Sequence, residues 1–301
     1  MWLKRKPSLS SPKKHHFVPQ WYLTRFADSD GFLNIYDKNN GMWRRQKPKE
    51  VMHRNKYYQQ SWAPDGIDPN ILERKFGEEI EPKAKNAFEK LLNWEEDLTT
   101  EEWADIFFYV AFQYIRVPLQ AEEAKELLRG FILAHGNPKS TKNVLEGRLK
   151  LRISDSFRFE YMRLSLGVII KSFMRMEWEI VTPESSSFVT TDSPVTLFNP
   201  RVSPPSRPGL GLIGTVVFFP IRPDKLILMR HKESLEGEPD LLKQIADIDQ
   251  EYEGTRVNEI MVWPREQVIR HNELMFRLAD RTVASKSKDC LEEFIGNVRG
   301  H

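Results

Sequence analysis

The sequence predicts an α+β protein with an N-terminal β-hairpin, a helical middle, and a C-terminal part of mixed strands and helices. Apolar residues recur at helical spacing through much of 67–176. On both sides of that block, short runs rich in β-branched and aromatic residues are bounded by Gly, Pro and Asp, which is typical of strands. Because helices and strands are segregated along the chain, we do not expect a doubly wound sheet.

The N-terminal hairpin is predicted from an Asn-Gly pair. Residues 32–36 and 42–45 are short apolar or aromatic runs, and Asn40-Gly41 lies between them. Asn-Gly favours the left-handed backbone of the tight turns that join antiparallel strands. Two paired strands are therefore expected here.

Helices are predicted next along the chain. Residues 72–92 have helical apolar spacing, and Pro82 is expected to kink or split this helix. Thr99 and Glu102 match a capping box at the start of a strongly apolar helix, which Pro118 should end or bend. Further helices are expected over 121–133 and over 142–176, the latter broken in the middle.

Strands predominate beyond residue 177. We expect strands at 178–181, 188–190, 215–219, 226–229 and 282–284, with helices at 240–249 and 266–278. The connection over 199–211 is long, and it is rich in proline and glycine.

Composition and charge limit the classes of protein that this chain can represent. The 301 residues are 40% hydrophobic, which is enough for a sizeable core. The 45 basic and 43 acidic residues nearly balance, so the net charge by itself does not indicate a nucleic-acid-binding protein. The single cysteine, Cys290, excludes an intramolecular disulfide and a Cys-rich metal site, and we expect it to pack in a C-terminal helix.

The ends and domains of the chain are assigned from charge and hydropathy. Residues 1–14 carry five cations and no acid, so we expect a flexible basic arm. A solvated terminus is the favoured interpretation, and contact with nucleic-acid phosphate is the alternative.

A single domain is expected over 15–301, which could divide near residue 177 into a helical part, 67–176, and a β-rich part, 177–285. With no signal-peptide pattern and no apolar run of spanning length, a cytoplasmic protein without a membrane partner is expected.

Two adjacent histidines, His15 and His16, form the sharpest polar feature. Imidazole suits proton transfer near neutral pH and also binds metals. Adjacent residues in an extended segment point to opposite faces, so at most one is expected to face a given site. The structural alternative is that a histidine caps a helix or bonds a backbone carbonyl.

Three further polar groups are candidates for chemistry. Glu73 and Glu81 lie eight residues apart and could share a helix face as metal ligands, although a solvated acidic face is the alternative. Gln113 and Arg116 share a face at i and i+3, where the arginine could hold a carboxylate or phosphate, or form a structural ion pair. Asp192 follows a strand and suits a metal ligand, a general base or an Asx turn.

Several familiar catalytic motifs are absent from the sequence. It has no P-loop, no dinucleotide-binding glycine fingerprint and no His-Glu-x-x-His motif. Ser193 lacks the glycines of a nucleophile elbow.

Taken together, these segments resemble a bacterial family known as domain of unknown function 4238. The family usually has Asn where this chain has Ser193, so the chain departs from the pattern there. The resemblance rests on the motifs His15-His16-x-Val-Pro-Gln-x-Tyr-Leu-x-Arg-Phe, Gln113-Tyr-Ile-Arg-Val-Pro118 and Phe188-Val-Thr-Thr-Asp-Ser-Pro-Val195, with weaker matches at 219–224 and 272–285.

The resemblance implies no established activity, but it indicates which polar residues converge on one pocket. Our hypothesis is a hydrolase-like enzyme acting on a phosphodiester, in which a divalent metal could take part. The alternative is a non-catalytic module that binds a ligand or protein and uses the same residues structurally. The expected catalytic residues are His15, His16, Arg116 and Asp192; the expected ligand-binding residues are Gln20, Tyr22, Arg25, Gln113, Thr191 and Asn272; the expected metal ligands are Glu81 and Asp192.

Overall fold

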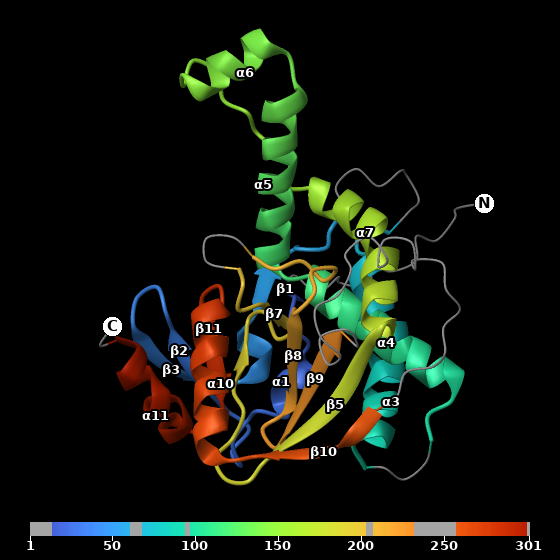
Figure 1. The fold of residues 1–301 in the computed structure, drawn as a ribbon, viewed down its shortest axis with the longest axis vertical. Helices are drawn as coiled ribbons and strands as arrows, with labels where there is room; N and C mark the ends of the chain where they lie inside the picture. The colour runs from blue at the N-terminus through green and yellow to red at the C-terminus, as the bar shows by residue number, and fades with distance from the viewer. Residues whose placement is uncertain (1–13, 61–67, 94–96, 203–206, 232–256, 300–301) are drawn as a thin grey trace, which may run out of the picture.

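A computed structural model describes residues 14–60, 68–93, 97–202, 207–231 and 257–299, and it confirms the α+β class (Figure 1). Three sheets and a set of helices make up the fold. The basic arm at 1–13 and the helix expected at 240–249 lie outside the described residues. Lys14, which was assigned to the arm, is instead the first residue of a strand.

The largest sheet has five strands in the order β10-β5-β9-β8-β7. β10 runs parallel to β5, and the other neighbours are antiparallel. Three of these strands, β5, β8 and β9, were predicted from sequence, whereas β7 and β10 were not. Their bounds are β5 Met176–Pro183, β7 Thr196–Phe198, β8 Val216–Arg222, β9 Lys225–His231 and β10 Val257–Trp263.

A second sheet brings the two ends of the chain together. It has the antiparallel order β3-β2-β11-β6. β2 and β3 are the predicted hairpin, whose Gly41 has a φ of 68° and donates from N–H to the carbonyl of Asp37 at 2.9 Å. The bounds are β2 Leu33–Asp37, β3 Met42–Gln46, β6 Thr190–Thr191 and β11 Thr282–Ser285.

The strand expected at 188–190 is only partly correct. Phe188 and Val189 precede β6 without strand pairing, and the strand is limited to two residues. The backbone N–H of Val189 instead donates to the side chain of Asn272 at 3.2 Å. A side-chain acceptor thus replaces the neighbouring strand at this position.

A small third sheet lies beside the N-terminal motif. β1 (Lys14–His16) pairs with β4 (His53–Asn55), and His16 lies opposite His53. Two short helices flank this pair, α1 (Gln20–Thr24) and the 3-10 turn η1 (Pro48–Glu50). The sequence analysis expected an extended segment at His15 and His16, but it predicted neither the pairing of β1 nor the strand β4.

The helical middle agrees with the sequence. The capping box is present, because Thr99 Oγ1 accepts from the N–H of Glu102 at 3.2 Å and the Glu102 carboxylate accepts from the N–H of Thr99 at 2.9 Å. α5 begins at Pro118, and the expected break divides the helix at 142–176 into α6 and α7. The bounds are α4 Thr100–Ile115, α5 Pro118–His135, α6 Pro138–Leu145 and α7 Phe157–Met174.

A π-helical turn interrupts the first long helix. α2 (Ile71–Lys75) passes into the π turn η2 (Phe76–Ile80) and then into α3 (Glu81–Asn93). Pro82 lies in the first turn of α3, so the expected split is confirmed.

Two C-terminal helices, α10 (Arg265–Leu278) and α11 (Lys288–Arg299), follow the five-stranded sheet along the chain. Cys290 is buried in α11 as expected.

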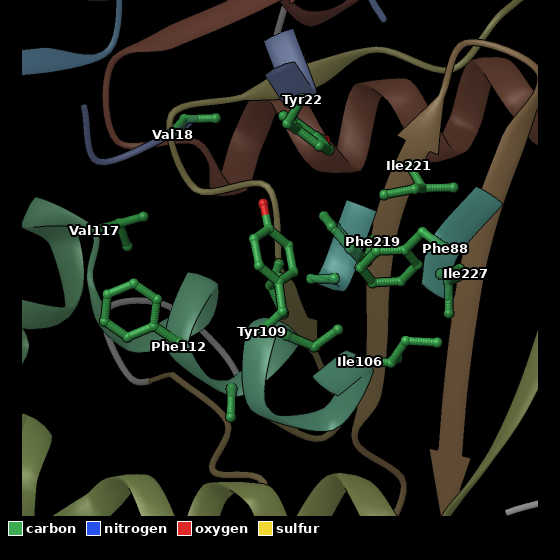
Figure 2. Packing of buried hydrophobic residues seen from close by; sticks show 14 of the residues in the cluster. Val18, Tyr22, Phe88, Ile106, Tyr109, Phe112, Val117, Phe219, Ile221 and Ile227 are labelled. Carbon is green, nitrogen blue, oxygen red and sulfur yellow. The ribbon is translucent and has the colours of Figure 1, made fainter. Parts of the chain in front are cut away.

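The five-stranded sheet is buried on both faces. Alternate residues of β8 and β9 face two different clusters, so Phe219 and Ile227 join one while Phe218 and Leu228 join the other. The first cluster lies under α3, α4 and α7, where Tyr109, Phe88 and Phe219 meet (Figure 2). The second cluster lies under α10 and α11. Within the described residues, no helix has the length and apolarity needed to cross a membrane.

Candidate functional site

The first two sequence motifs meet at the backbone carbonyl of Phe17. Gln113 Nε2 and Arg116 Nε both donate to this oxygen at 3.0 Å. Gln113 lies in the last turn of α4, and Arg116 is the residue that caps its C-terminal end. A spacing of three residues places the two side chains on one face. The N–H of Phe17 donates to the carbonyl of Met52 at 3.1 Å, which fixes the segment against the residues before β4.

His15 points into the protein interior. Its ring is fully buried and stacks on Tyr58 with a centroid distance of 6.0 Å. His15 Nδ1 accepts from the N–H of Tyr58 at 2.9 Å, and the Tyr58 hydroxyl donates to the carbonyl of Arg116 at 3.4 Å. These contacts fit the structural alternative for His15, while its catalytic role stays a prediction.

His16 points the other way, as the alternation of an extended strand requires. Its ring lies edge-on to His53 with a centroid distance of 5.3 Å, and Gln20 Nε2 approaches His16 Nδ1 at 3.4 Å. Burial, followed by the neighbouring His53, lowers the pKa of His16 to about 4. The imidazole is therefore neutral at pH 7.

Arg116 pairs with Glu81 and lies close enough to Glu73 to influence its charge. Its guanidinium is 1% exposed, and Nη1 pairs with Glu81 Oε1 at 3.1 Å. Burial raises the pKa of Glu73 to about 7, with Arg116 opposing this shift and Glu81 adding to it. Glu73 thus titrates near neutral pH beside a buried cation.

The π turn explains why both glutamates face Arg116. Eight residues cover slightly more than two α-helical turns, so a straight helix would rotate Glu81 past Glu73. In the π turn the N–H of Glu81 bonds the carbonyl of Phe76, five residues back, and this wider turn removes the excess rotation. Such turns often occur at functional sites.

Two buried polar atoms of this junction have no hydrogen-bond partner among the described residues. They are Arg116 Nη2 and Gln113 Oε1. Because buried polar atoms are usually paired, Arg116 Nη2 is available to donate to a bound molecule or water, and Gln113 Oε1 is available to accept from one.

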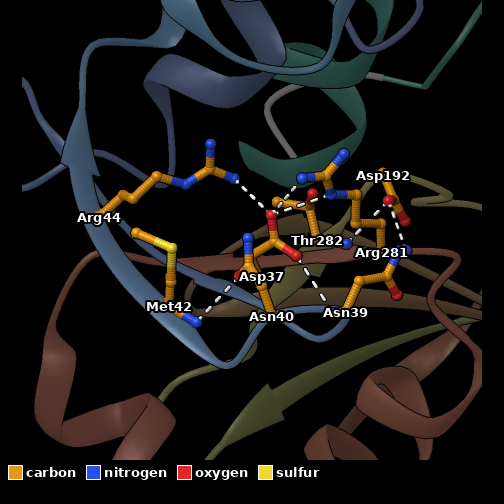
Figure 3. Close-up of polar contacts among 8 residues, drawn as sticks. All are labelled: Asp37, Asn39, Asn40, Met42, Arg44, Asp192, Arg281 and Thr282. Carbon is orange, nitrogen blue, oxygen red and sulfur yellow. Dashed lines mark hydrogen bonds and ion pairs between the residues drawn. The ribbon is translucent and has the colours of Figure 1, made fainter.

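The carboxylate of Asp192 holds the loop that precedes β11. It accepts from the N–H groups of Asp280, Arg281 and Thr282 at 3.1, 2.8 and 2.8 Å (Figure 3). Burial raises the pKa of Asp192 to about 6, although these three donors favour the charged form. Asp192 therefore positions the backbone of Arg281.

Arg281 and Arg44 converge on one buried carboxylate. Arg281 donates to Asp37 Oδ2 from Nε at 2.9 Å and Nη2 at 2.8 Å, and Arg44 donates to the same oxygen from Nη2 at 3.1 Å (Figure 3). Hydrogen bonding to Arg281 outweighs the burial that opposes it, so the pKa of Asp37 is lowered. One anion therefore anchors two guanidinium groups.

A cavity of about 320 Å³ joins the three sequence motifs. The first motif contributes Phe17, the second Pro118 and the third Asp192 and Ser193. Ser193 is buried, and its Oγ has no hydrogen-bond partner among the described residues. The remaining wall is formed by Arg44, Gln46, Glu50, Val51, Met52, His53, Arg54, Leu119, Asp280, Arg281 and Thr282.

The predicted ligand-binding residues do not line this cavity. The Tyr22 hydroxyl bonds Thr190 Oγ1 at 2.8 Å, and Arg25 pairs with Glu89. Thr191 Oγ1 accepts from the N–H of Ser193 at 3.1 Å. Asn272 bridges two backbone groups, accepting from Val189 N–H at 3.2 Å and donating to the Ser187 carbonyl at 2.9 Å. These contacts connect parts of the fold, and the expected ligand-binding roles stay predictions.

Metal binding also stays a prediction. Among the described residues, no three His, Cys, Asp or Glu side chains come together as metal ligands would. Glu81 pairs with Arg116, whereas both oxygens of Asp192 accept backbone N–H groups.

Sequence reasoning missed the residues that form most of the cavity wall. His53 and Arg54 reach it because β4 pairs with β1, and Arg281 reaches it because β11 joins the N-terminal hairpin. The 272–285 match included Arg281, but no local pattern singled it out.

Comparison with known proteins gives one match. A family model described as "Protein of unknown function (DUF4238)" matches residues 14–289. No curated protein and no solved structure matches this chain.

Proposed function

The chain belongs to the DUF4238 family, and we propose that it binds a small ligand carrying an oxyanion in the cavity beside Asp192. The observation that supports this proposal is the shared anchoring of Arg44 and Arg281 by Asp37 at the cavity wall. Arg44 uses only Nη2 in this contact, and Arg281 uses Nε and Nη2. A guanidinium has five N–H donors, so further donors of both residues can reach a ligand oxyanion.

The start of α5 adds donors of a second kind. Pro118 and Leu119 form the first turn of this helix, and both line the cavity. The first N–H groups of a helix have no partner within it, and they favour an anion nearby. Pro118 has no N–H, so the donor that the lining residues of α5 supply is the N–H of Leu119. Ser193 also lines the cavity, and its buried hydroxyl, which has no partner among the described residues, is a further donor that we propose for the same group.

The acidic residues of the wall narrow the class of ligand. Glu50 and Asp280 are exposed there, so the wall carries both signs of charge. A simple inorganic anion would meet repulsion from these carboxylates. We therefore infer a phosphorylated or carboxylated molecule that also carries hydroxyl or amino donors.

Hydrolysis of a phosphodiester in this cavity is the second candidate function. It is supported by His53, which lines the cavity and lies edge-on to His16. Burial lowers the pKa of His53, so its neutral ring can accept a proton from water at pH 7. We propose no metal-bound step. The non-catalytic interpretation has the same binding groups but requires no proton transfer by His53.

Three expectations from the sequence remain proposals. We propose contact of the basic arm at 1–14 with nucleic acid on its charge alone, since it carries five cations and no acid. A cytoplasmic location and a single domain over 15–301 are carried forward on the sequence alone.

Ligand binding is tested by calorimetric titration with inorganic phosphate, a nucleoside monophosphate and a dicarboxylate. We expect the nucleoside monophosphate to bind wild type, and Arg281→Gln to weaken it about 10- to 100-fold, since a charge-assisted contact contributes about 1.5–3 kcal/mol. Arg163→Gln is the matched control, because Arg163 is an exposed α7 residue that pairs with Glu160 and does not line the cavity. Equal affinity in both variants, or no binding by any probe, would refute the proposal.

Hydrolysis is tested separately with a chromogenic phosphodiester. We expect His53→Ala to lower kcat at least 100-fold while leaving the affinity for a non-hydrolysable analogue unchanged, because general base catalysis contributes about 10²–10⁴-fold. His231→Ala is the control, since His231 bonds the carbonyl of Leu210 and lines no part of this cavity. Unchanged turnover in His53→Ala would favour the binding function alone.

A further inference from the structure

A projecting arm carries a surface that the proposed cavity function does not use. α5 runs away from the body of the molecule, and α6 lies at its far end (Figure 1). We call residues 136–152, which comprise α6 and the segments on either side, the arm tip. α5 has 18 residues, which gives the arm a length of about 27 Å at 1.5 Å per residue.

The arm tip is strongly basic. It contains five cations and one carboxylate, and all six side chains are exposed. The carboxylate, Glu146, is already paired with Arg148 at 3.0 Å and lies 4.0 Å from Lys142. The cations are Lys139, Lys142, Arg148, Lys150 and Arg152.

Apolar side chains lie among these cations. Leu145 is 71% exposed and Leu149 is 50% exposed, on either side of Gly147, whose φ is 74°. Single exposed leucines are ordinary, but two beside five cations at the far end of an arm form one amphipathic surface. Leucines that enter the headgroup region, combined with cations that contact acidic headgroups, are typical of peripheral membrane binding.

We propose that the arm tip docks on a bilayer surface that contains anionic lipid. The arm tip has a net charge of +4, which complements the negative charge of such a surface. Because α6 lies at the far end of α5, the arm tip can contact a bilayer before the body of the protein does. A nucleic acid would use the cations but leave Leu145 and Leu149 without a role. Docking of this kind requires no membrane-spanning helix, and it departs from the sequence-based expectation of no membrane partner.

The test measures co-sedimentation of the full-length protein with vesicles. One vesicle preparation is phosphatidylcholine alone, and the other contains phosphatidylglycerol as well. Leu145→Ser/Leu149→Ser removes the apolar contacts, and Arg148→Gln/Lys150→Gln/Arg152→Gln removes three cations. The matched control is Leu164→Ser/Val168→Ser, because these two α7 residues are also strongly exposed but lie outside the arm tip.

We expect binding only to vesicles with phosphatidylglycerol, and weaker binding at higher salt. The charge variant should bind about 100-fold more weakly, since each cation near an anionic surface contributes roughly a fivefold factor. The leucine variant should lose about tenfold or more, and the control should match wild type.

Three outcomes would overturn the proposal. The first is absence of vesicle binding, and the second is binding that the leucine variant leaves unchanged. The third is binding of a fluorescent oligonucleotide that depends on the cations but not on the leucines, with no vesicle binding, which would assign the tip to nucleic acid. None of these outcomes bears on ligand binding in the cavity.

Discussion

Arg116 and Arg281 are each held by a carboxylate, yet they occupy opposite environments. The side chain of Arg116 is 1% exposed and bonds Glu81 and the Phe17 carbonyl, so its known contacts lie within the protein. The side chain of Arg281 is 51% exposed, and it is the anchor, Asp37, that is fully buried. In the first pair the buried charge is the arginine cation, whereas in the second pair it is the aspartate anion. Arg116 therefore connects segments of the fold, whereas Arg281 is presented to a ligand.

The largest expected effect is a difference in the free energy of unfolding between variants of these two arginines. Arg116→Met should lower the free energy of unfolding by about 3 kcal/mol, because it leaves the Glu81 carboxylate without this partner and the Phe17 carbonyl with Gln113 in place of two side-chain donors. Arg281→Met should cost only about 1 kcal/mol, since Arg44 and the N–H of Asn39 still contact Asp37. Urea unfolding of both variants measures the difference. Equal losses would show that exposure does not distinguish the two pairs.

In ligand binding the same two variants should rank the other way, so that Arg281→Met weakens binding more than Arg116→Met does. Arg281→Met removes a donor at the cavity wall, while Arg116 does not line the cavity. If Arg116→Met folds and binds the nucleoside monophosphate as weakly as Arg281→Met, the junction around Arg116 belongs to the ligand site. That result would join the two regions into one site.

The second prediction concerns pH, and it sharpens the description of the buried junction. The pKa of Glu73 is raised from 4.5 to about 7, so Glu73 stabilises the fold below pH 4.5 and this stabilisation is lost as the pH rises to 7. Glu73→Gln should therefore gain about 1 kcal/mol over wild type between pH 5 and pH 8, after allowance for solvent screening. Unfolding at both pH values measures the gain.

The control for this prediction is Glu78→Gln, on the same helical run. Glu78 is exposed on the π turn. A pH dependence that is identical in Glu73→Gln and Glu78→Gln would place Glu73 in solvent rather than beside Arg116.

The two regions also differ in how far sequence predicts them. Thr99, Glu102, Pro118 and the spacing of Gln113 and Arg116 are local signals, and they predicted the helices and one face of the junction. The cavity depends instead on contacts between distant segments, since Asp192 bonds residues 88 to 90 positions later in the chain. β1 and β4 have three residues each, so their pairing is decided by tertiary packing rather than local propensity. His53 and Arg281 could not be assigned to one site for this reason.

The smallest expected effect is that of the Ser193 hydroxyl. Its backbone is already fixed, because the N–H of Ser193 bonds Thr191 Oγ1 and its carbonyl accepts from Thr196 Oγ1. Ser193 Oγ has no partner among the described residues, so Ser193→Ala should change the free energy of unfolding by less than about 0.5 kcal/mol. Binding of the nucleoside monophosphate should nevertheless weaken about fivefold, the value of one neutral hydrogen bond. Thr196→Val is the contrasting variant. It removes the hydrogen bond from Thr196 Oγ1 to the Ser193 carbonyl and should therefore lower the free energy of unfolding. A loss of stability in Ser193→Ala without a loss of affinity would mean that the hydroxyl serves the fold, and that the cavity binds its ligand through the arginines alone.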